Sequence, residues 1–425
     1  SSYTLSFSVL AILVIYVLTH RSFSKFFVFP LIQYYNPEKT VYKSVNFLQR
    51  FGNDIPFKMK LPFLGEWTVS QGYHGSITHL GEWGSALDFV ITDDDQKTYS
   101  GSGTGKDDYY CYNKPVVAPA DGYVYQISNF TPDNEINEVN TRKNWGNSII
   151  INHLNGLYTQ LSHLKKDSFK VRVGDYVTKG TVLATCGNSG RSPEPHLHFQ
   201  VQLIPEIGAK THPYPFGYYF EKTDDKPILR MGEVPAENAV VYNVDSLDLI
   251  EHAFDFMPGK ELNATFNGDK VRWVVATNEY NQSYIFCEKT KSTAYFVNDG
   301  TMFYFTDFEG RKSSALYTFY RGCFKLLLAG EQSIEVKDRI PLSKELPLAV
   351  KWLQDFIAPV VLLSRVRFSS RLSQFDNPFY PESAQFVNRV ELKSFGKKQS
   401  ATEYRVTISR SKIEIKTENQ NLCIE

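Results

Sequence analysis

The feature that most constrains the fold is a succession of short runs in which apolar and polar residues alternate. The runs lie between about Pro56 and Phe220 and are separated by Gly, Asn and Pro. Alternation with a period of two is typical of half-buried β-strands, and frequent turn residues keep the strands short. Among the runs are KPVVAPADGYVYQI, GNSIIINHL, GLYTQLSHL and VRVGDYVTKGTVLATCGNSG. We therefore expect an all-β domain, interrupted by two polar surface insertions at 93–113 and 128–145.

A chain of 425 residues is too long for one ordinary core, so two folded domains are expected. Residues 223–240 are charged and contain two prolines, which predicts a linker between a first domain at 56–222 and a second at 241–425. The second domain continues the strand pattern and adds an apolar, helix-like segment at 344–368. The expected fold class is mainly β: an antiparallel sheet domain, then a β-rich accessory domain with one long helix.

The N-terminal residues 1–32 are strongly apolar. The run from Leu5 to Thr19 carries no charge, and a second apolar run, FFVFPLI, follows shortly after. The first run alone is shorter than the roughly 20 residues that a membrane span needs. We expect a membrane anchor followed by a juxtamembrane spacer at 33–55, with a signal-peptide core or a buried helix as alternatives. The nearest positive charges follow the run, and the positive-inside tendency would then leave the bulk of the chain in the cytoplasm. Residues upstream of Ser1 could reverse that count, so the orientation of such an anchor stays open.

Charge and cysteine content exclude several kinds of protein. Lys+Arg and Asp+Glu both number 46, so no basic excess points to a nucleic-acid partner. The five cysteines are scattered and never occur in a CxxC spacing, which argues against a cysteine zinc site or a thioredoxin-like motif. One or two disulfides and buried free thiols both remain open.

The segment PEPHLHFQVQL at 193–203 alternates strictly. In a strand, His196 and His198 project from the same face, together with Gln200 and Gln202. Two imidazoles side by side, next to a turn stiffened by proline, indicate a binding site rather than an exposed polar edge.

Asp88 interrupts an otherwise apolar run, SALDFVI. A carboxylate among such residues is costly to bury unless it is paired or binds a metal. His74 and His79 lie just upstream, and either can join Asp88 on one ion. Two His and one Asp around an open fourth position suit catalytic zinc, although other divalent ions accept the same ligands. His163, alone near the end of GLYTQLSHL, is by itself a weak signal.

These segments carry a resemblance to a known family. From about Gln71 to Leu203 the chain resembles the lysostaphin-type zinc metallopeptidases, which hydrolyse peptidoglycan and have the duplicated hybrid motif fold. The matching segments occur in the family's order: QGYHGSITHLGEWGSALDFV, PVVAPADGYVYQI, GNSIIINHLNGLYTQLSHL, VRVGDYVTKGTVLATCGNSGRS and PHLHFQV. One of them also resembles the turn of biotinyl and lipoyl carrier domains, which lack the HLH pattern.

The resemblance implies a site. It makes His79, Asp88 and His198 the ligands of Zn²⁺, and His163 and His196 the catalytic pair. Eight residues separate His79 from Asp88, a wider spacing than usual in the family, so His74 stays a rival for the first ligand.

Two functional hypotheses follow. The first is a peptidoglycan endopeptidase in the cell envelope, periplasmic and membrane-anchored, whose substrate is the peptide cross-link. The second is a membrane-tethered subunit of an envelope complex, which uses the peptidase fold for binding partner proteins or for local wall remodelling.

Overall fold

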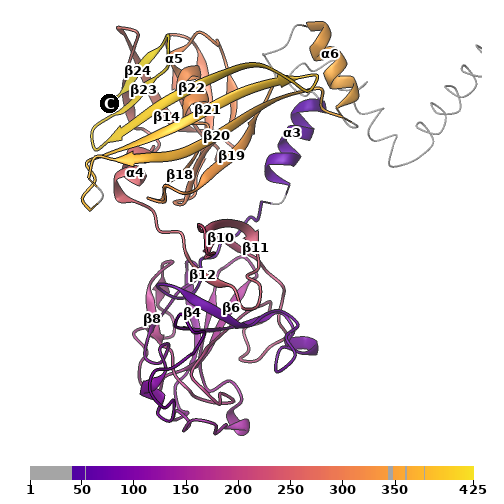
Figure 1. Cartoon of the computed structure of the whole chain (residues 1–425), viewed down its shortest axis with the longest axis vertical. Coiled ribbons are helices and arrows are strands. Elements are labelled where there is room, and N and C mark those ends of the chain that lie inside the picture. The colour runs from indigo at the N-terminus through magenta and orange to yellow at the C-terminus, as the bar shows by residue number, and fades with distance from the viewer. Residues whose placement is uncertain (1–40, 53, 343–347, 359–360, 378) are drawn as a thin grey trace, which may run out of the picture. The chain divides into compact units, whose positions relative to one another are not determined.

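The computed structural model describes residues 41–425 apart from 53, 343–347, 359–360 and 378. They form two compact units (Figure 1). The first domain comprises residues 55–244, and the second combines residues up to Asp54 with 245–425. The predicted membrane segment at 1–32 lies outside the described residues. Within the described part of the chain, no helix has both the length and the apolar character needed to cross a bilayer.

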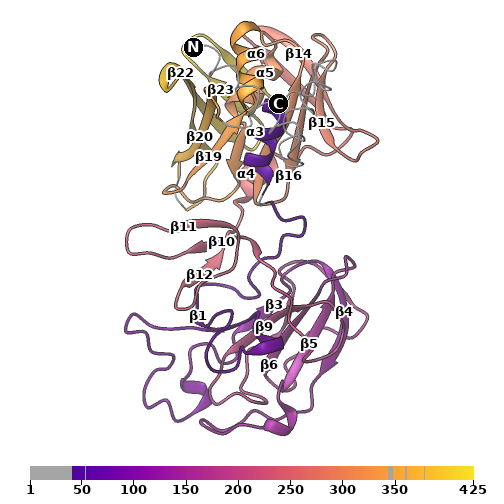
Figure 2. The same cartoon turned by 90° about the vertical axis from the view of Figure 1, so that its right-hand side faces the viewer.

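The first domain is built on one antiparallel sheet, with the strand order β11-β10-β12-β1-β2-β9-β6-β5-β4-β7 (Figure 2). A small second sheet pairs β3 with β8. The strands are β1 Trp67–Gln71, β2 Ala86–Val90, β3 Pro115–Val117, β4 Gly122–Ser128, β5 Asn147–Asn152, β6 Tyr158–Leu164, β7 Tyr176–Val177, β8 Val182–Thr185, β9 Leu197–Gln202, β10 Phe216–Glu221, β11 Ile228–Glu233 and β12 Val240–Asn243. Three single turns of 3₁₀ helix are η1 Gly81–Trp83, η2 Lys106–Asp108 and η3 Thr141–Lys143.

The alternation in the sequence explains the two faces of this sheet. The apolar members of each strand, such as Val69, Phe89 and Phe199, pack into one core and are at most 1% exposed. The polar members of the central strands β2, β9 and β6 point to the opposite face, where they are also buried. A buried face of polar side chains has to find partners for its hydrogen-bonding groups, and the candidate site lies there.

The expected linker at 223–240 is wrong. Residues Ile228–Glu233 form β11, which pairs with β10, and β12 begins at Val240 and pairs with both β10 and β1. Because β11 is an edge strand with mostly half-buried or exposed side chains, its composition resembles that of a linker. The domain boundary therefore lies at 244/245 rather than at 222.

The second domain is a twelve-stranded antiparallel sheet with the order β18-β17-β16-β15-β14-β13-β24-β23-β22-β21-β20-β19. Its strands are β13 Glu261–Phe266, β14 Asp269–Thr277, β15 Ser283–Cys287, β16 Ser292–Asn298, β17 Met302–Glu309, β18 Lys325–Leu327, β19 Glu335–Ile340, β20 Ser364–Phe375, β21 Ser383–Ser394, β22 Lys397–Ser409, β23 Ile413–Lys416 and β24 Asn421–Ile424. Its helices are α3 Val41–Phe51, α4 Asp248–Ala253, α5 Ala315–Gly322 and α6 Leu348–Ile357. Aromatic side chains of α5 and the strands fill the core, among them Trp273, Phe305 and Phe319.

The long helix expected at 344–368 is only partly helical. Helix α6 ends at Ile357, and β20 begins at Ser364. Pro359 cannot continue a helix, and the sequence after it, SRVRFSSRL, alternates with the period of a strand. The apolar residues on both sides of the proline hid this change of period.

The expected spacer at 33–55 contains α3, which belongs to the second domain. Its Arg50 side chain is 1% exposed and forms an ion pair with Asp338 in β19 at 3.1 Å. The guanidinium also donates to the carbonyl oxygens of Phe305 and Thr306, and it lies over the ring of Phe324. A buried charge with this many partners fixes α3 to the sheet.

We predict that Arg50→Ala destabilises the second domain by about 3–5 kcal/mol, because it leaves the buried Asp338 carboxylate without its main partner. Denaturant unfolding of the full chain measures the change. Arg405→Gln, which breaks an exposed pair with Glu403, is the control and should change stability by about 1 kcal/mol or less. Equal effects of the two substitutions would contradict this account of α3.

Candidate metal centre

Four side chains form a row across neighbouring strands. The register places Gln71 of β1 opposite Asp88 of β2, Asp88 opposite His198 of β9, and His198 opposite Ser162 of β6. Directly opposed residues lie on the same face of a sheet, so these side chains meet on the polar face. Asp88 accepts a hydrogen bond from Gln71 Nε2 at 2.9 Å, and its other oxygen lies 2.8 Å from His198 Nδ1.

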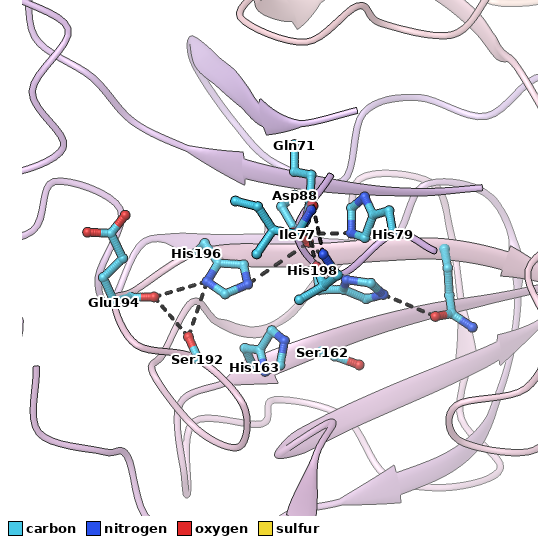
Figure 3. A network of polar contacts seen from close by, with 12 residues as sticks. Gln71, Ile77, His79, Asp88, Ser162, His163, Ser192, Glu194, His196 and His198 are labelled. Carbon is cyan, nitrogen blue, oxygen red and sulfur yellow. Dashed lines mark hydrogen bonds and ion pairs between the residues drawn. The ribbon is translucent and has the colours of Figure 1, made fainter. Parts of the chain in front are cut away.

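His79 completes the group from outside the sheet (Figure 3). Its Nε2 lies 3.2 Å from Asp88 Oδ2, and the ring lies 5.5 Å from that of His198. One ligand atom from each of His79, Asp88 and His198 lies within 4.8 Å of the others. Ligand atoms at about 2.0–2.2 Å from a tetrahedral zinc ion lie roughly 3.3–3.5 Å apart, so small shifts would bring these three onto one ion.

In both His79 and His198, the ring nitrogen that points away from Asp88 is hydrogen-bonded. His79 Nδ1 donates to the Gly72 carbonyl at 3.0 Å, and His198 Nε2 donates to Gln200 Oε1 at 3.0 Å. The Gln200 amide is itself oriented, because its nitrogen donates to the Ala209 carbonyl. The nitrogens that face Asp88 are thus the ones available to a cation: His198 Nδ1 is hydrogen-bonded to Asp88 Oδ1 in the structure, and His79 Nε2 lies 3.2 Å from Oδ2. This donor set fits a divalent cation.

The charges around Asp88 favour its ionised form. Burial alone would raise the pKa of Asp88, but the imidazoles of His196, His198 and His79 outweigh it and hold that pKa well below the ordinary value. Burial likewise opposes a charge on His79, yet the adjacent Asp88 carboxylate raises the pKa of His79. The site therefore provides one negative charge, which a bound cation would neutralise.

His163 reaches the same pocket through an unusual backbone conformation. It follows Ser162 in β6, so regular alternation would direct it into the opposite face. Its φ of +61° breaks that alternation, and its ring lies 4.7 Å from the ring of His196. Its Nδ1 donates to the Ser189 carbonyl at 2.8 Å. Burial, then the imidazoles of His196 and His198, hold the pKa of His163 well below its ordinary value, so the ring is neutral at pH 7.

His196 lies just before β9, on the loop at 188–196. Its Nδ1 donates to the Glu194 carbonyl at 2.9 Å and lies 3.1 Å from Ser192 Oγ. Its Nε2 lies 4.0 Å from Asp88 Oδ1. His163 and His196 thus lie beside the His79–Asp88–His198 group and have their Nδ1 atoms bonded to backbone carbonyls.

The two insertions brace this loop. Asn134 donates to the Gly190 and Ser192 carbonyls, and Asp133 accepts from the Asn188 amide. From the other insertion, the Cys111 thiol donates to the Pro195 carbonyl, one residue before His196. Both insertions, expected as surface features that reshape a groove, therefore hold the segment that carries His196.

The four imidazoles and Asp88 line a groove of about 280 Å³. Trp83 and Trp145 line it with their rings 6.2 Å apart, and Trp83 donates to the Gly208 carbonyl. Arg191 and Glu194 also line it. The groove therefore combines aromatic and charged walls.

Comparison with known proteins agrees with this geometry. The sequence profile of peptidase family M23 matches residues 103–211. These residues lie within the first domain, which we call the M23 domain. The M23 domain is similar to the cell division protein DipM of Caulobacter vibrioides, with 30% identity over 99 residues, which cover 23% of this chain and 14% of that protein.

Solved structures are also similar to the M23 domain. The catalytic domain of lysostaphin from Staphylococcus simulans has 21% identity, covers 35% of this chain and 89% of its own, and gives a TM-score of 0.22. The catalytic domain of the prophage-encoded M23 protein EnpA from Enterococcus faecalis has 16% identity, covers 36% and 94%, and gives 0.26. The profile match begins after His79 and Asp88, so those two residues rest on the geometry alone.

Four histidines of the M23 domain lie at the candidate site, and the others lie elsewhere. His74, the rival first ligand, is exposed and lies outside the group of ligand atoms. His153 is buried elsewhere, bonded to the Asp121 carbonyl and to Thr159. Gln71 and Trp145 could not be predicted as site residues, because strand register and the walls of a groove are not visible in one sequence. Gln200 was predicted on the shared face, although its hydrogen bond to His198 was not.

We predict that Gln200→Ala weakens metal binding to the M23 domain by about 10–100-fold, because His198 loses the acceptor that sets its tautomer. Competition with a zinc chelator measures the affinity. Gln160→Ala is the matched control, since Gln160 is equally buried in the adjacent β6 but bonds Ser162 and Gly208 instead. An equal loss in both variants would show that general damage, not ligand orientation, is responsible.

His153 predicts an acid-sensitive contribution to stability. Burial lowers its pKa, so the folded state binds its proton less readily than the unfolded state. Stability therefore falls as the pH drops below the unfolded-state value of about 6.5. We expect His153→Gln to show a shallower fall in melting temperature between roughly pH 7 and pH 5, the range in which this histidine takes up its proton in the unfolded chain. A slope identical to that of the unmodified chain would rule this contribution out.

Proposed function

We propose that this protein is a zinc-dependent endopeptidase that hydrolyses the peptide cross-links of bacterial peptidoglycan. The observation that carries the proposal is the convergence of His79, Asp88 and His198, whose ligand atoms lie within 4.8 Å of one another. The imidazoles of His163 and His196 lie beside them. The match of residues 103–211 to peptidase family M23 supports the same reaction class.

In this proposal His79 Nε2, Asp88 and His198 Nδ1 hold the metal. Bound zinc would supply Lewis acidity toward the peptide carbonyl and would lower the pKa of water. Gly72 and Gln200 keep the two ligand imidazoles in the tautomer that leaves the inner nitrogen free. Gln71, bonded to Asp88 Oδ2, restrains the carboxylate.

His163 and His196 handle protons and developing charge. Because His163 donates through Nδ1 to a carbonyl, its Nε2 is an unprotonated acceptor, and its lowered pKa keeps it so at neutral pH. His196 is held by Glu194 in the same way and presents Nε2 beside the Asp88 carboxylate. An imidazole with a free Nε2 can accept a proton from water, and the Nε2–H so formed can then donate to the developing oxyanion or pass the proton to the leaving amine.

The substrate and the location extend the proposal. The DipM relative is named a cell division protein, which supports a role in the bacterial cell envelope for this chain also. We place the M23 domain in the periplasm, held at the membrane by residues 1–32. The groove beside the metal ligands, about 280 Å³ with tryptophan on one wall, suits a peptide bridge rather than a deep small-molecule pocket.

The size of the second domain favours a binding function as the alternative. Residues 245–425, with α3, form a sheet with its own core, larger than a peptidase of this kind requires for catalysis. The alternative is a membrane-tethered subunit of an envelope complex in which the M23 domain binds rather than cleaves.

The decisive test measures zinc content and muropeptide cleavage in the full chain. We expect one zinc per chain, and we expect His198→Ala to lose both zinc and cleavage. His163→Ala should keep zinc while kcat falls by about 10²–10⁴-fold, because it removes proton transfer without removing a ligand.

His74→Ala is the matched control, since this exposed histidine lies outside the group and should change neither quantity. Zinc binding without any cleavage would favour the binding subunit. Absence of zinc would exclude the enzyme mechanism.

A further inference from the structure

The outward face of β19–β22 concentrates positive charge in a chain whose formal net charge is zero. The inward residues of these strands, such as Val366, Phe368 and Phe386, are at most 2% exposed and form the core. The alternating outward positions hold eight cationic side chains and three carboxylates. The cations are Lys337, Arg339, Arg365, Arg367, Arg371, Arg389, Lys393 and Arg405, and the carboxylates are Glu335, Glu391 and Glu403. We call these positions the cationic face.

Each carboxylate of the cationic face already has a partner. Glu335 pairs with Lys337 at 2.9 Å, and Glu391 pairs with Lys393 at 3.6 Å. Glu403 pairs with Arg405 at 3.3 Å. Each carboxylate also lies directly opposite an arginine of the neighbouring strand, Glu335 opposite Arg371, Glu391 opposite Arg367 and Glu403 opposite Arg389. The cations nevertheless outnumber the carboxylates, so the face keeps an excess of positive charge.

Three of the remaining arginines lie together. Arg367 and Arg371 flank Ser369 on the same side of β20, and Ser369 is directly opposite Arg389 of β21. Diagonal neighbours in such a pair are about 7–8 Å apart at Cβ. All three side chains are exposed, and their guanidinium groups form no hydrogen bond or ion pair with the part of the chain that the structure describes. Like charges this close favour an external anion.

The turn joining the same two strands displays aromatic side chains. Phe379 and Tyr380 are 84% and 82% exposed, and they lie between the end of β20 and the start of β21. Asn377 Oδ1 accepts hydrogen bonds from the amides of both residues. Asp376 Oδ1 accepts from the amides of Glu382 and Ser383, which closes the turn. These bonds hold the backbone of the aromatic turn while leaving its rings in solvent.

We propose that the cationic face and the turn bearing Phe379 and Tyr380 bind the surface of an anionic lipid membrane. Guanidinium groups suit the phosphate of lipid headgroups, and aromatic rings suit the boundary between headgroups and acyl chains. A soluble polyanion would satisfy the arginines but would give the two exposed rings no apolar contact. The pairing of both features on one hairpin is what favours a bilayer. Figure 1 shows β20–β22 with no helix drawn across them in that view.

This inference is independent of the peptidase reaction and of the predicted anchor at 1–32. It assigns the second domain a membrane-orienting role of its own. Hydrogen exchange of the 376–382 turn in the full chain tests it directly, because an N-terminal anchor alone would not protect that turn. The probes are vesicles of phosphatidylcholine with and without phosphatidylglycerol.

We expect exchange in the turn to slow on vesicles that contain phosphatidylglycerol and to stay unchanged on pure phosphatidylcholine. Each arginine near an anionic surface contributes about fivefold in affinity. Arg367→Gln, Arg371→Gln and Arg389→Gln together should therefore raise, about a hundredfold, the concentration of phosphatidylglycerol-containing vesicles at which the turn is half protected. Phe379→Ser with Tyr380→Ser should remove the protection of the turn.

Two matched controls come from the first domain. Arg142→Gln with Arg172→Gln removes exposed arginines, and Phe130→Ser removes a ring that is 82% exposed. Neither should alter protection of the turn. Protection on neutral vesicles that survives the triple arginine substitution would overturn the proposal. So would an unprotected turn on anionic vesicles, or protection by purified peptidoglycan instead of lipid.

Discussion

The buried carboxylate of Asp88 is the interaction on which the arrangement of the M23 domain depends. It lies in the middle of a strand whose neighbours are apolar, so its charge requires compensation from the polar face. Gln71 and His198 from the adjoining strands, with His79 from a loop, supply that compensation. Removing any one of these contacts would leave the others misaligned. The polar face is thus organised outward from a single ionised group.

Much of the polar face around Asp88 could be predicted from the sequence, because strand periodicity determines which side chains share a face. The shared face of His198 and Gln200 follows from alternation alone, and the unusual position of Asp88 follows from its apolar neighbours. His163 could not be predicted by the same rule, since it reaches the pocket by breaking the alternation with a positive φ. Its inclusion depended on a family resemblance rather than on local pattern.

The incorrect predictions of a linker at 223–240 and of a long helix at 344–368 also have physical causes. An exposed edge strand and a linker share a polar composition, so β11 could not be distinguished from a connection between domains. An apolar helix and an apolar strand joined by a proline also look continuous, which concealed the end of α6 and the start of β20. In both cases the missing information was pairing with a partner distant in sequence. Such pairing contributes most of the stability of a sheet but leaves little trace in any one segment.

The discontinuous second domain has a consequence for how the chain folds. Arg50 and Asp338 are 288 residues apart in sequence, so α3 leaves the ribosome long before the strand to which it binds. Synthesis proceeds from the N-terminus, and domains generally fold as units. The M23 domain can therefore collapse first, which shortens the effective loop that α3 has to close. Until then, α3 exposes the apolar side chains that it later buries, such as Tyr42. Folding of the M23 domain thus shortens the effective chain between the two segments that form the second domain.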